Sequence, residues 1–303
     1  EDALSAIERF ATSKISSVSD LECIRTLGFR GEALPSIAAC SRLTLETKTD
    51  GSDSGIAIYI DGGKVTKIEE KGLPTGTTVT VEDLFFNTPA RLKFMKSKSR
   101  ERDASIEVVE RLALAWPHIS FTLNSQNKTI FHTSGTGARN ALTDIFGPNM
   151  TDSVIEIHGY DNEKGVTIEG FIGTPANYRA SRDRQLFSVN QRPVRNSMLG
   201  WAVDAAYLGL LPPKSYPTCI LNINIPPDQI DVNVHPTKAE VKFKDEREIR
   251  RLVTETVRRS LSEAGYLFDP IDSQQTNTGP IGKSAQFGNA RSTLLDCSTL
   301  LDY

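Results

Sequence analysis

Apolar residues recur along this chain with two different periods, and these periods predict its helices and strands. A spacing of three to four residues predicts helices in these segments: 2–10, 33–40, 106–116, 198–210 and 246–264. Alternation of apolar and polar residues predicts strands in these segments: 43–46, 56–60, 65–68, 77–81, 120–123, 129–132, 154–157, 166–171, 185–190 and 219–225. The chain therefore mixes helices with largely antiparallel strands.

Turn-forming residues divide these elements into two predicted units of α+β fold. The run Ser-Gly-Thr-Gly at 134–137 separates them, so we expect one domain over residues 1–134, a two-layer sandwich, and a second over 135–268. Residues 269–303 are mostly polar, with few apolar side chains before Leu294. Such a composition cannot offset its ordering entropy, so we expect a flexible linker.

Composition excludes several classes of protein. No run of about 18 apolar residues exists, and nothing after Glu1 resembles a signal peptide, so no membrane association is expected. The four cysteines show no C-x-x-C pair, which argues against zinc and disulfides and fits the reducing cytoplasm. The net charge of −3 means that any nucleic-acid contact must come from local basic patches.

The segment Leu-Gly-Phe-Arg-Gly-Glu-Ala-Leu at 27–34 is the strongest candidate for chemistry. Two glycines let a ligand approach the backbone, and the following helix begins with N–H groups that have no partner inside it. An anion such as phosphate fits there, with Arg30 adding a charged contact. A plain turn between two helices explains the same residues about equally well.

The residues just upstream favour the phosphate site. The segment Ala-Thr-Ser-Lys-Ile at 11–15 supplies Thr12, Ser13 and Lys14, and the serine-rich residues after it predict a mobile flap. A capping box at 19–22 predicts a short helix that ends at Gly28. Together, the segments at 11–15 and 27–34 resemble the ATP lid of the MutL mismatch repair family, a branch of the GHKL ATPases.

Other segments extend the resemblance in the family's order. Thr77 begins a strand and can be there for β-propensity alone, but it resembles the family's adenine-binding threonine. The run Asn-Thr-Pro-Ala-Arg-Leu-Lys-Phe at 87–94 can be a turn with a solvated basic face, and it also matches a family segment in which we interpret Asn87 and Pro89 as structural. Lys238, in His-Pro-Thr-Lys, matches the lysine that reaches the γ-phosphate, whereas His235 is interpreted as structural.

A cluster of arginines in the second unit is a candidate DNA contact. Arg179 and Arg182 precede the run Val-Asn-Gln-Arg that ends at Arg192 and resembles a family strand-turn segment. Cations of this kind bind DNA without sequence preference by releasing counterions. An ordinary solvated loop is an equally good explanation from the residues, and the resemblance favours DNA for Arg192.

The resemblance implies a fold, a reaction and partners. The implied fold is a truncated GHKL (Bergerat) two-layer sandwich followed by a ribosomal-protein-like transducer domain. The implied reaction is slow, Mg²⁺-dependent ATP hydrolysis. The residues implied to bind the nucleotide are Thr12, Ser13, Lys14, Gly28, Phe29, Arg30, Gly31, Thr77 and Lys238. The implied partners are DNA, a second copy of the chain, the mismatch-recognition protein MutS, and a downstream repair nuclease or helicase in the bacterial cytoplasm and nucleoid.

One departure from the family pattern limits these expectations. The family's first two motifs, which carry the catalytic glutamate, the magnesium-binding asparagine and an adenine-binding loop, are expected before Glu1. We therefore assign no catalytic residue or metal ligand and expect this chain to hydrolyse ATP poorly or not at all. The alternative is a non-catalytic scaffold that binds DNA or a protein partner and keeps the phosphate loop only as structure.

Overall fold

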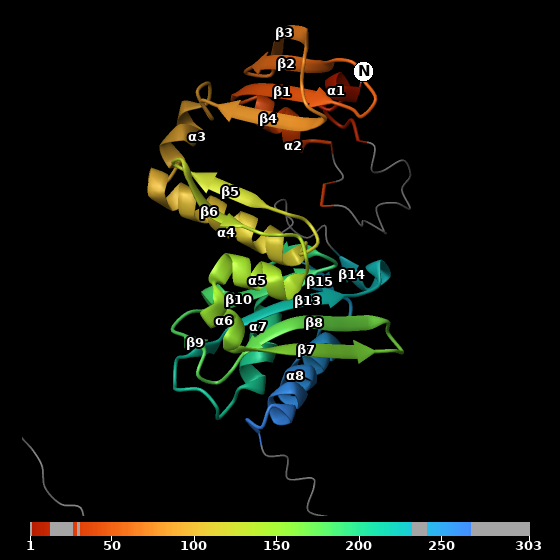
Figure 1. Ribbon diagram of the computed structural model, residues 1–303. Helices are drawn as coiled ribbons and strands as arrows, with labels where there is room; N and C mark the ends of the chain where they lie inside the picture. The colour runs from red at the N-terminus through yellow and green to blue at the C-terminus, as the bar shows by residue number, and fades with distance from the viewer. Residues whose placement is uncertain (1, 13–26, 29–30, 232–240, 268–303) are drawn as a thin grey trace, which may run out of the picture. The chain divides into compact units, whose positions relative to one another are not determined.

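A computed structural model describes residues 2–12, 27–28, 31–231 and 241–267 (Figure 1). These residues all belong to one of the two units into which the chain divides, residues 1–267. The domain boundary expected near residue 134 stays a prediction. The predictions for residues 13–26, 29–30, 232–240 and 269–303 lie outside the described ranges. They include the flap, the linker and the sites at Ser13, Lys14, Phe29, Arg30 and Lys238.

The first sheet has four antiparallel strands in the order β3-β2-β1-β4. They are β1 (Arg42–Lys48), β2 (Gly55–Asp61), β3 (Lys64–Lys71) and β4 (Gly76–Glu82), and they confirm the predicted strands. Strands β1, β2 and β3 pair in sequence order as an antiparallel meander, in line with the largely antiparallel strands predicted. β4, however, pairs with β1 at the opposite edge, with Leu43 beside Val81 and Leu45 beside Val79.

Two short helices, α1 (Asp2–Ser5) and α2 (Ala33–Ala38), accompany this sheet. Its buried core consists of Ala38, Leu43, Leu45, Ile58 and Ile60, against which Leu4 and Ile7 also pack. The helix predicted over 2–10 is shorter than expected and ends at Ser5, and Phe10 adopts a left-handed backbone with φ of 66° that is not helical.

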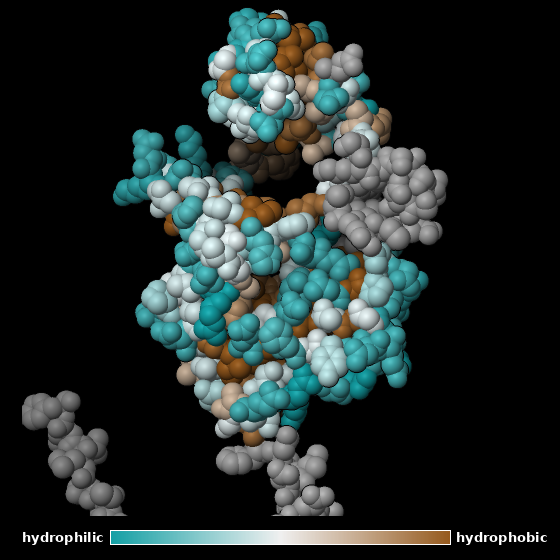
Figure 2. Space-filling model, turned by 45° about the vertical axis from the view of Figure 1, so that its right-hand side comes forward, coloured by the Kyte–Doolittle hydropathy of each residue, from teal (hydrophilic) through white to brown (hydrophobic). Residues whose placement is uncertain are grey.

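The core face of this sheet is only partly covered. Apolar residues of the outer strands remain exposed, namely Val65, Ile68, Val79 and Val81. In Figure 2 hydrophobic residues accordingly reach the surface at the height of the first sheet.

The next elements are α3 (Pro89–Phe94), α4 (Lys98–Ala115) and the hairpin of β5 (Thr122–Ser125) and β6 (Lys128–His132). The Ser97 side chain caps α4 by accepting from the Arg100 backbone amide. The helix therefore begins at Lys98, before the predicted segment 106–116. The two strands were predicted, over 120–123 and 129–132, as part of the first two-layer sandwich. In the described ranges they form a separate two-stranded sheet.

The second sheet has five strands in the order β11-β10-β13-β8-β7. They are β7 (Val154–Asp161), β8 (Val166–Gly173), β10 (Gln185–Val189), β11 (Arg192–Val194) and β13 (Cys219–Asn224). The β10–β13 pair is parallel, and the other pairs are antiparallel. Short strands β9 (Tyr178–Arg179) with β12 (Tyr216–Pro217), and β14 (Ile230–Asp231) with β15 (Lys242–Phe243), form two further pairs.

Helices pack on both faces of this sheet. On one face, α7 (Ser197–Ala206) and α8 (Glu246–Glu263) bury the largest core, which includes Ile168, Leu199, Leu221, Val253 and Val257. On the other, α5 (Ala138–Phe146) and α6 (Pro148–Asp152) supply Leu142 and Met150 to a smaller core. The elements around this second sheet therefore form an α+β arrangement, as predicted for residues 135–268.

Candidate nucleotide-binding site

The backbone around Gly31 lies against the start of the upstream segment, so the structure brings together parts of the two segments, 11–15 and 27–34, that resemble the family's ATP lid. Gly31 has a left-handed φ of 61°, and a Cβ atom placed on it would lie 2.3 Å from the carbonyl oxygen of Ala11. The Phe10 amide donates to the Gly31 carbonyl at 3.2 Å. Residues 10–12 therefore lie against the glycine loop, and only glycine fits at position 31.

The helix after this loop is short and is fixed at its far end. α2 begins at Ala33, and no side chain caps it. At its C-terminal end, the Asn87 side-chain amide donates to the Ala39 carbonyl at 2.9 Å, and the Phe85 backbone amide donates to the Cys40 carbonyl at 2.6 Å. The interpretation of Asn87 as a structural residue is confirmed. Pro89 occupies the first turn of α3, where its missing N–H costs nothing.

An arginine that no sequence pattern indicated adds to these contacts near the C-terminal end of α2. Arg42, at the start of β1, donates to the Asp83 carboxylate at 2.5 Å and lies 5.1 Å from the centre of the Phe86 ring. The two groups follow β4, which lies beside β1. Only the strand pairing brings them to Arg42, so no local motif could have indicated the contact.

Thr77 occupies the edge strand β4 and is exposed. Its hydroxyl lies 2.8 Å from that of Thr47, its cross-strand neighbour on β1. The contact holds the side chain in place but gives no sign of a ligand. Its role in binding adenine stays a prediction.

The three arginines proposed for DNA have different surroundings. Arg179 is exposed on β9. Arg182 donates two hydrogen bonds to the Asp204 carboxylate, at 2.6 and 3.0 Å, and stacks on Tyr216 at 4.3 Å. Arg192 is only 7% exposed, and its guanidinium donates to the Leu27 carbonyl at 3.4 Å.

Burial changes the electrostatics of Arg192. It lowers the pKa of the guanidinium from its ordinary value, because the charged form loses hydration. A direct contact with DNA requires an exposed guanidinium, and the buried Arg192 side chain does not present one to solvent.

The run Val-Asn-Gln-Arg forms the tight turn between β10 and β11, which explains the asparagine at position 190. Asn190 and Gln191 both have left-handed backbones, with φ of 48° and 62°. The Asn190 side chain donates to the Ile225 carbonyl and accepts from the Ile225 amide, each at 2.9 Å. This reciprocal pair fixes the β10–β11 turn to the end of β13, so Asn190 is a structural residue.

No acidic or thiol cluster in the described ranges could hold a metal ion. We therefore assign none of these residues to Mg²⁺. No described helix is long and apolar enough to span a bilayer.

Comparison with known proteins places this architecture in a class. The solved structure titled "Crystal Structure of N terminal domain of a DNA repair protein" matches with a TM-score of 0.68 and 26% identity, covering 82% of this chain and 83% of that one. The Aquifex aeolicus MutL ATPase domain complexed with ADP matches with a TM-score of 0.54 and 23% identity, covering 78% and 80%. The fold is that of the GHKL ATPase domains.

Sequence comparison identifies the family. Residues 142–262 match the family described as "DNA mismatch repair protein, C-terminal domain". The DNA mismatch repair protein MutL of Heliobacterium modesticaldum is 44% identical over 262 residues, which are 86% of this chain and 40% of that protein. MutL of Streptococcus equi subsp. zooepidemicus is 42% identical over 273 residues, which are 90% of this chain and 41% of that protein. The chain belongs to the MutL family and spans less than half the length of these relatives.

Proposed function

We propose that this chain forms part of the ATP-binding region of a MutL protein and that nucleotide binding controls its association with a second copy and with DNA. In this proposal, the amides of Gly28, Phe29, Arg30 and Gly31, together with Thr12, Ser13 and Lys14, bind the phosphates. Thr77 serves the adenine, and Lys238 contacts the γ-phosphate. ATP and Mg²⁺ are the cofactors in this proposal.

One observation carries the proposal. The Gly31 loop and residues 10–12 are about twenty positions apart in the sequence, yet they are in backbone contact at the start of α2. Asn87 fixes the other end of that helix. Gly31 and α2 are thus held in one arrangement before a ligand arrives, which reduces the entropy cost of binding at the start of the helix.

The proposed role in repair follows from the family. We propose that two nucleotide-bound copies close around DNA and couple mismatch recognition by MutS to strand removal by a downstream nuclease or helicase. Of the arginines, Arg179 is the one that the structure leaves exposed on a strand, whereas the Asp204 carboxylate already neutralises Arg182. We therefore give Arg179 the larger share of the DNA contact.

Binding of a fluorescent ATP analogue, followed by anisotropy, tests the nucleotide site. Arg30→Ala and Lys238→Ala are each expected to weaken binding about tenfold, because each removes a charged contact to phosphate. Lys128→Ala, at the tip of the β5–β6 hairpin, is the matched control for loss of one lysine. Lys238→Ala should also abolish the preference for ATP over ADP and reduce nucleotide-dependent dimerisation.

The outcome that contradicts the proposal is equally specific. If the analogue does not bind, or if Arg30→Ala and Lys238→Ala bind it as well as Lys128→Ala does, the glycine loop is only structural. The chain would then be a scaffold for DNA or a protein partner.

A further inference from the structure

One face of the second sheet changes from apolar to polar within a few residues. The strand register places Leu186, Ile220 and Phe171 in one row across β10, β13 and β8. All three are buried and pack with residues of α5 and α6. Two residues away on each strand, in the same direction across the sheet, this face carries a second row of side chains.

The second row is polar and internally hydrogen-bonded. It consists of Ser188, Asn222 and Glu169, which lie side by side on the three strands. Ser188 donates to the Asn222 side-chain oxygen at 3.0 Å, and Asn222 donates onward to Asn224 at 3.3 Å. Asn224 in turn donates to the Thr167 hydroxyl at 3.3 Å. These bonds fix the orientation of both amides, while each amide oxygen keeps room for a second donor.

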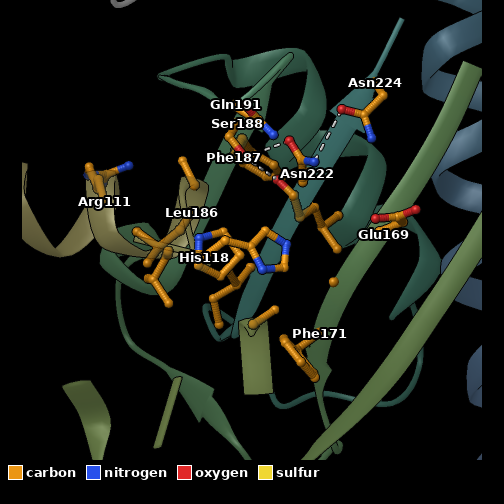
Figure 3. A pocket seen from close by; sticks show the side chains of 17 residues that line it. Arg111, His118, Glu169, Phe171, Leu186, Phe187, Ser188, Gln191, Asn222 and Asn224 are labelled. Atoms are coloured by element: carbon orange, nitrogen blue, oxygen red, sulfur yellow. Dashed lines mark hydrogen bonds between the residues drawn. The ribbon is translucent and has the colours of Figure 1, made fainter. Parts of the chain in front are cut away.

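A cavity of about 190 Å³ lies over the boundary between the two rows (Figure 3). Leu186 and Phe171 line its apolar part, and Asn222, Asn224 and Glu169 line its polar part. In Figure 3, Arg111 lies at one end of the cavity and Glu169 lies at the other. The cavity therefore offers an apolar surface next to acceptor groups.

The charges of the two ends are not equivalent. Arg111 donates to the Glu107 carboxylate at 2.9 and 3.0 Å, but Arg195 donates to the same carboxylate at 3.0 Å, so one acid is shared by two arginines at this end. The Glu169 side chain has no hydrogen bond or ion pair within the ranges that the structure describes. The negative charge at the Glu169 end of the cavity is thus uncompensated. That end favours a cation with N–H donors.

We propose that this cavity binds a guanidinium group, supplied either by an arginine side chain of a partner protein or by a free guanidino compound. Glu169 forms the ion pair, and the amide oxygens of Asn222 and Asn224 accept further N–H donors. Leu186 and Phe171 contact the aliphatic stem. A planar guanidinium with five donors suits a row of acceptors on a flat sheet better than a compact ammonium does.

Titration calorimetry on the complete 303-residue chain tests the proposal. The probes are agmatine, as the free compound, and the peptide acetyl-Gly-Arg-Gly-amide, with the uncharged citrulline peptide as the matched control. Agmatine and the arginine peptide are expected to bind, and citrulline is expected to bind at least about tenfold more weakly, because a hydrogen-bonded charge is lost. Tighter binding of the peptide identifies a protein partner. Equal or tighter binding of agmatine identifies a free ligand.

Two variants distinguish the cavity from general surface charge. Glu169→Gln keeps the shape of the side chain and is expected to weaken binding about tenfold. Glu156→Gln removes a carboxylate from β7 on the same face of the sheet, where Glu156 lies beside Phe171 and pairs with Arg139. It is expected to change binding less than twofold. Both residues are exposed, and unchanged thermal unfolding of each variant verifies the fold.

Three results would each overturn the proposal. The first is no heat of binding for either guanidinium probe at about 20 mM, well above the range of weak specific sites. The second is equal affinity for the arginine and citrulline peptides. The third is a Glu169→Gln variant that binds like the unaltered chain.

Discussion

Replacing Gly31 with alanine perturbs the contact on which the proposed nucleotide site rests. The new Cβ atom would stand 2.3 Å from the Ala11 carbonyl oxygen, where ordinary contact begins near 3.4 Å. One of the two segments must therefore move by about 1 Å, a shift that packed backbone resists. The left-handed φ of 61° adds its own strain, because only glycine adopts it freely.

The size of the effect can be worked from these two terms. A left-handed backbone costs a non-glycine residue about 1–2 kcal/mol. If residues 10–12 move away to relieve the clash, the bond from the Phe10 amide to Gly31 is lost, which costs a further 0.5–1.5 kcal/mol, roughly. The local structure should therefore lose about 1.5–3.5 kcal/mol. Gly51→Ala is a matched control, since Gly51 has a φ of 80° but nothing lies within 4 Å of its added Cβ.

Hydrogen exchange measured by NMR reports the local effect directly. In Gly31→Ala, protection of the Phe10 amide should fall about tenfold or more, which corresponds to roughly 1.5 kcal/mol. Affinity for the ATP analogue should fall with it. In Gly51→Ala, exchange at Phe10 should not change. Equal exchange at Phe10 in both variants would refute the view that close backbone approach, rather than backbone conformation alone, requires glycine at position 31.

Three further predictions concern Asn190, Glu110 and the arginines Arg179 and Arg182. Asn190→Ala should lower the free energy of unfolding by about 1–3 kcal/mol, because it leaves both polar groups of the Ile225 backbone without their Asn190 partner. Urea unfolding measures this loss, and a loss below roughly 0.5 kcal/mol contradicts the prediction. Burial raises the pKa of Glu110, so the folded state holds its proton more tightly than the unfolded state does. The contribution of Glu110 to stability should therefore decrease as the pH rises from its ordinary pKa through the raised value, and Glu110→Gln should remove that decrease; identical pH profiles of thermal unfolding for both proteins would exclude it. Finally, Arg179→Ala should reduce the salt dependence of DNA binding by about one counterion, whereas Arg182→Ala should have a smaller effect, and equal slopes would argue against the difference that we draw between them.

Most of the strands and longer helices follow from the sequence. The segments 56–60, 166–171 and 219–225 alternate clearly, and strands are found there as β2, β8 and β13. Helix α8 begins at Glu246 as the pattern predicted. These segments are predictable because each buries one face, and burial imposes the period of the side chains on the sequence.

Strand partners and short helices were less predictable. Nothing local indicates that β4 pairs with β1, because any strand with apolar residues on one face could fill that position. The helix predicted over 2–10 ends at Ser5, and Phe10, with a left-handed backbone, bonds to Gly31 instead of continuing the helix. Local propensity is a weak guide where a distant segment fixes the backbone.

The candidate sites show the same division. The glycines, Asn87 and the arginines could be singled out by residue type and spacing, and so could the resemblance to the MutL family. The structural role of Asn190, the burial of Arg192 and the pairing of Arg182 with Asp204 could not. Each depends on contacts between residues more than twenty positions apart.

The sequence by itself determined the order of helices and strands, the family, and the residue types available for binding phosphate and DNA. Tertiary structure decided which of these residues are exposed, which are neutralised, and which lie together, as Gly31 does with Ala11 and Ser188 with Asn222. The physical reason is that side-chain period is a local property of the chain. Burial and charge compensation, in contrast, depend on the groups that folding brings within a few ångströms.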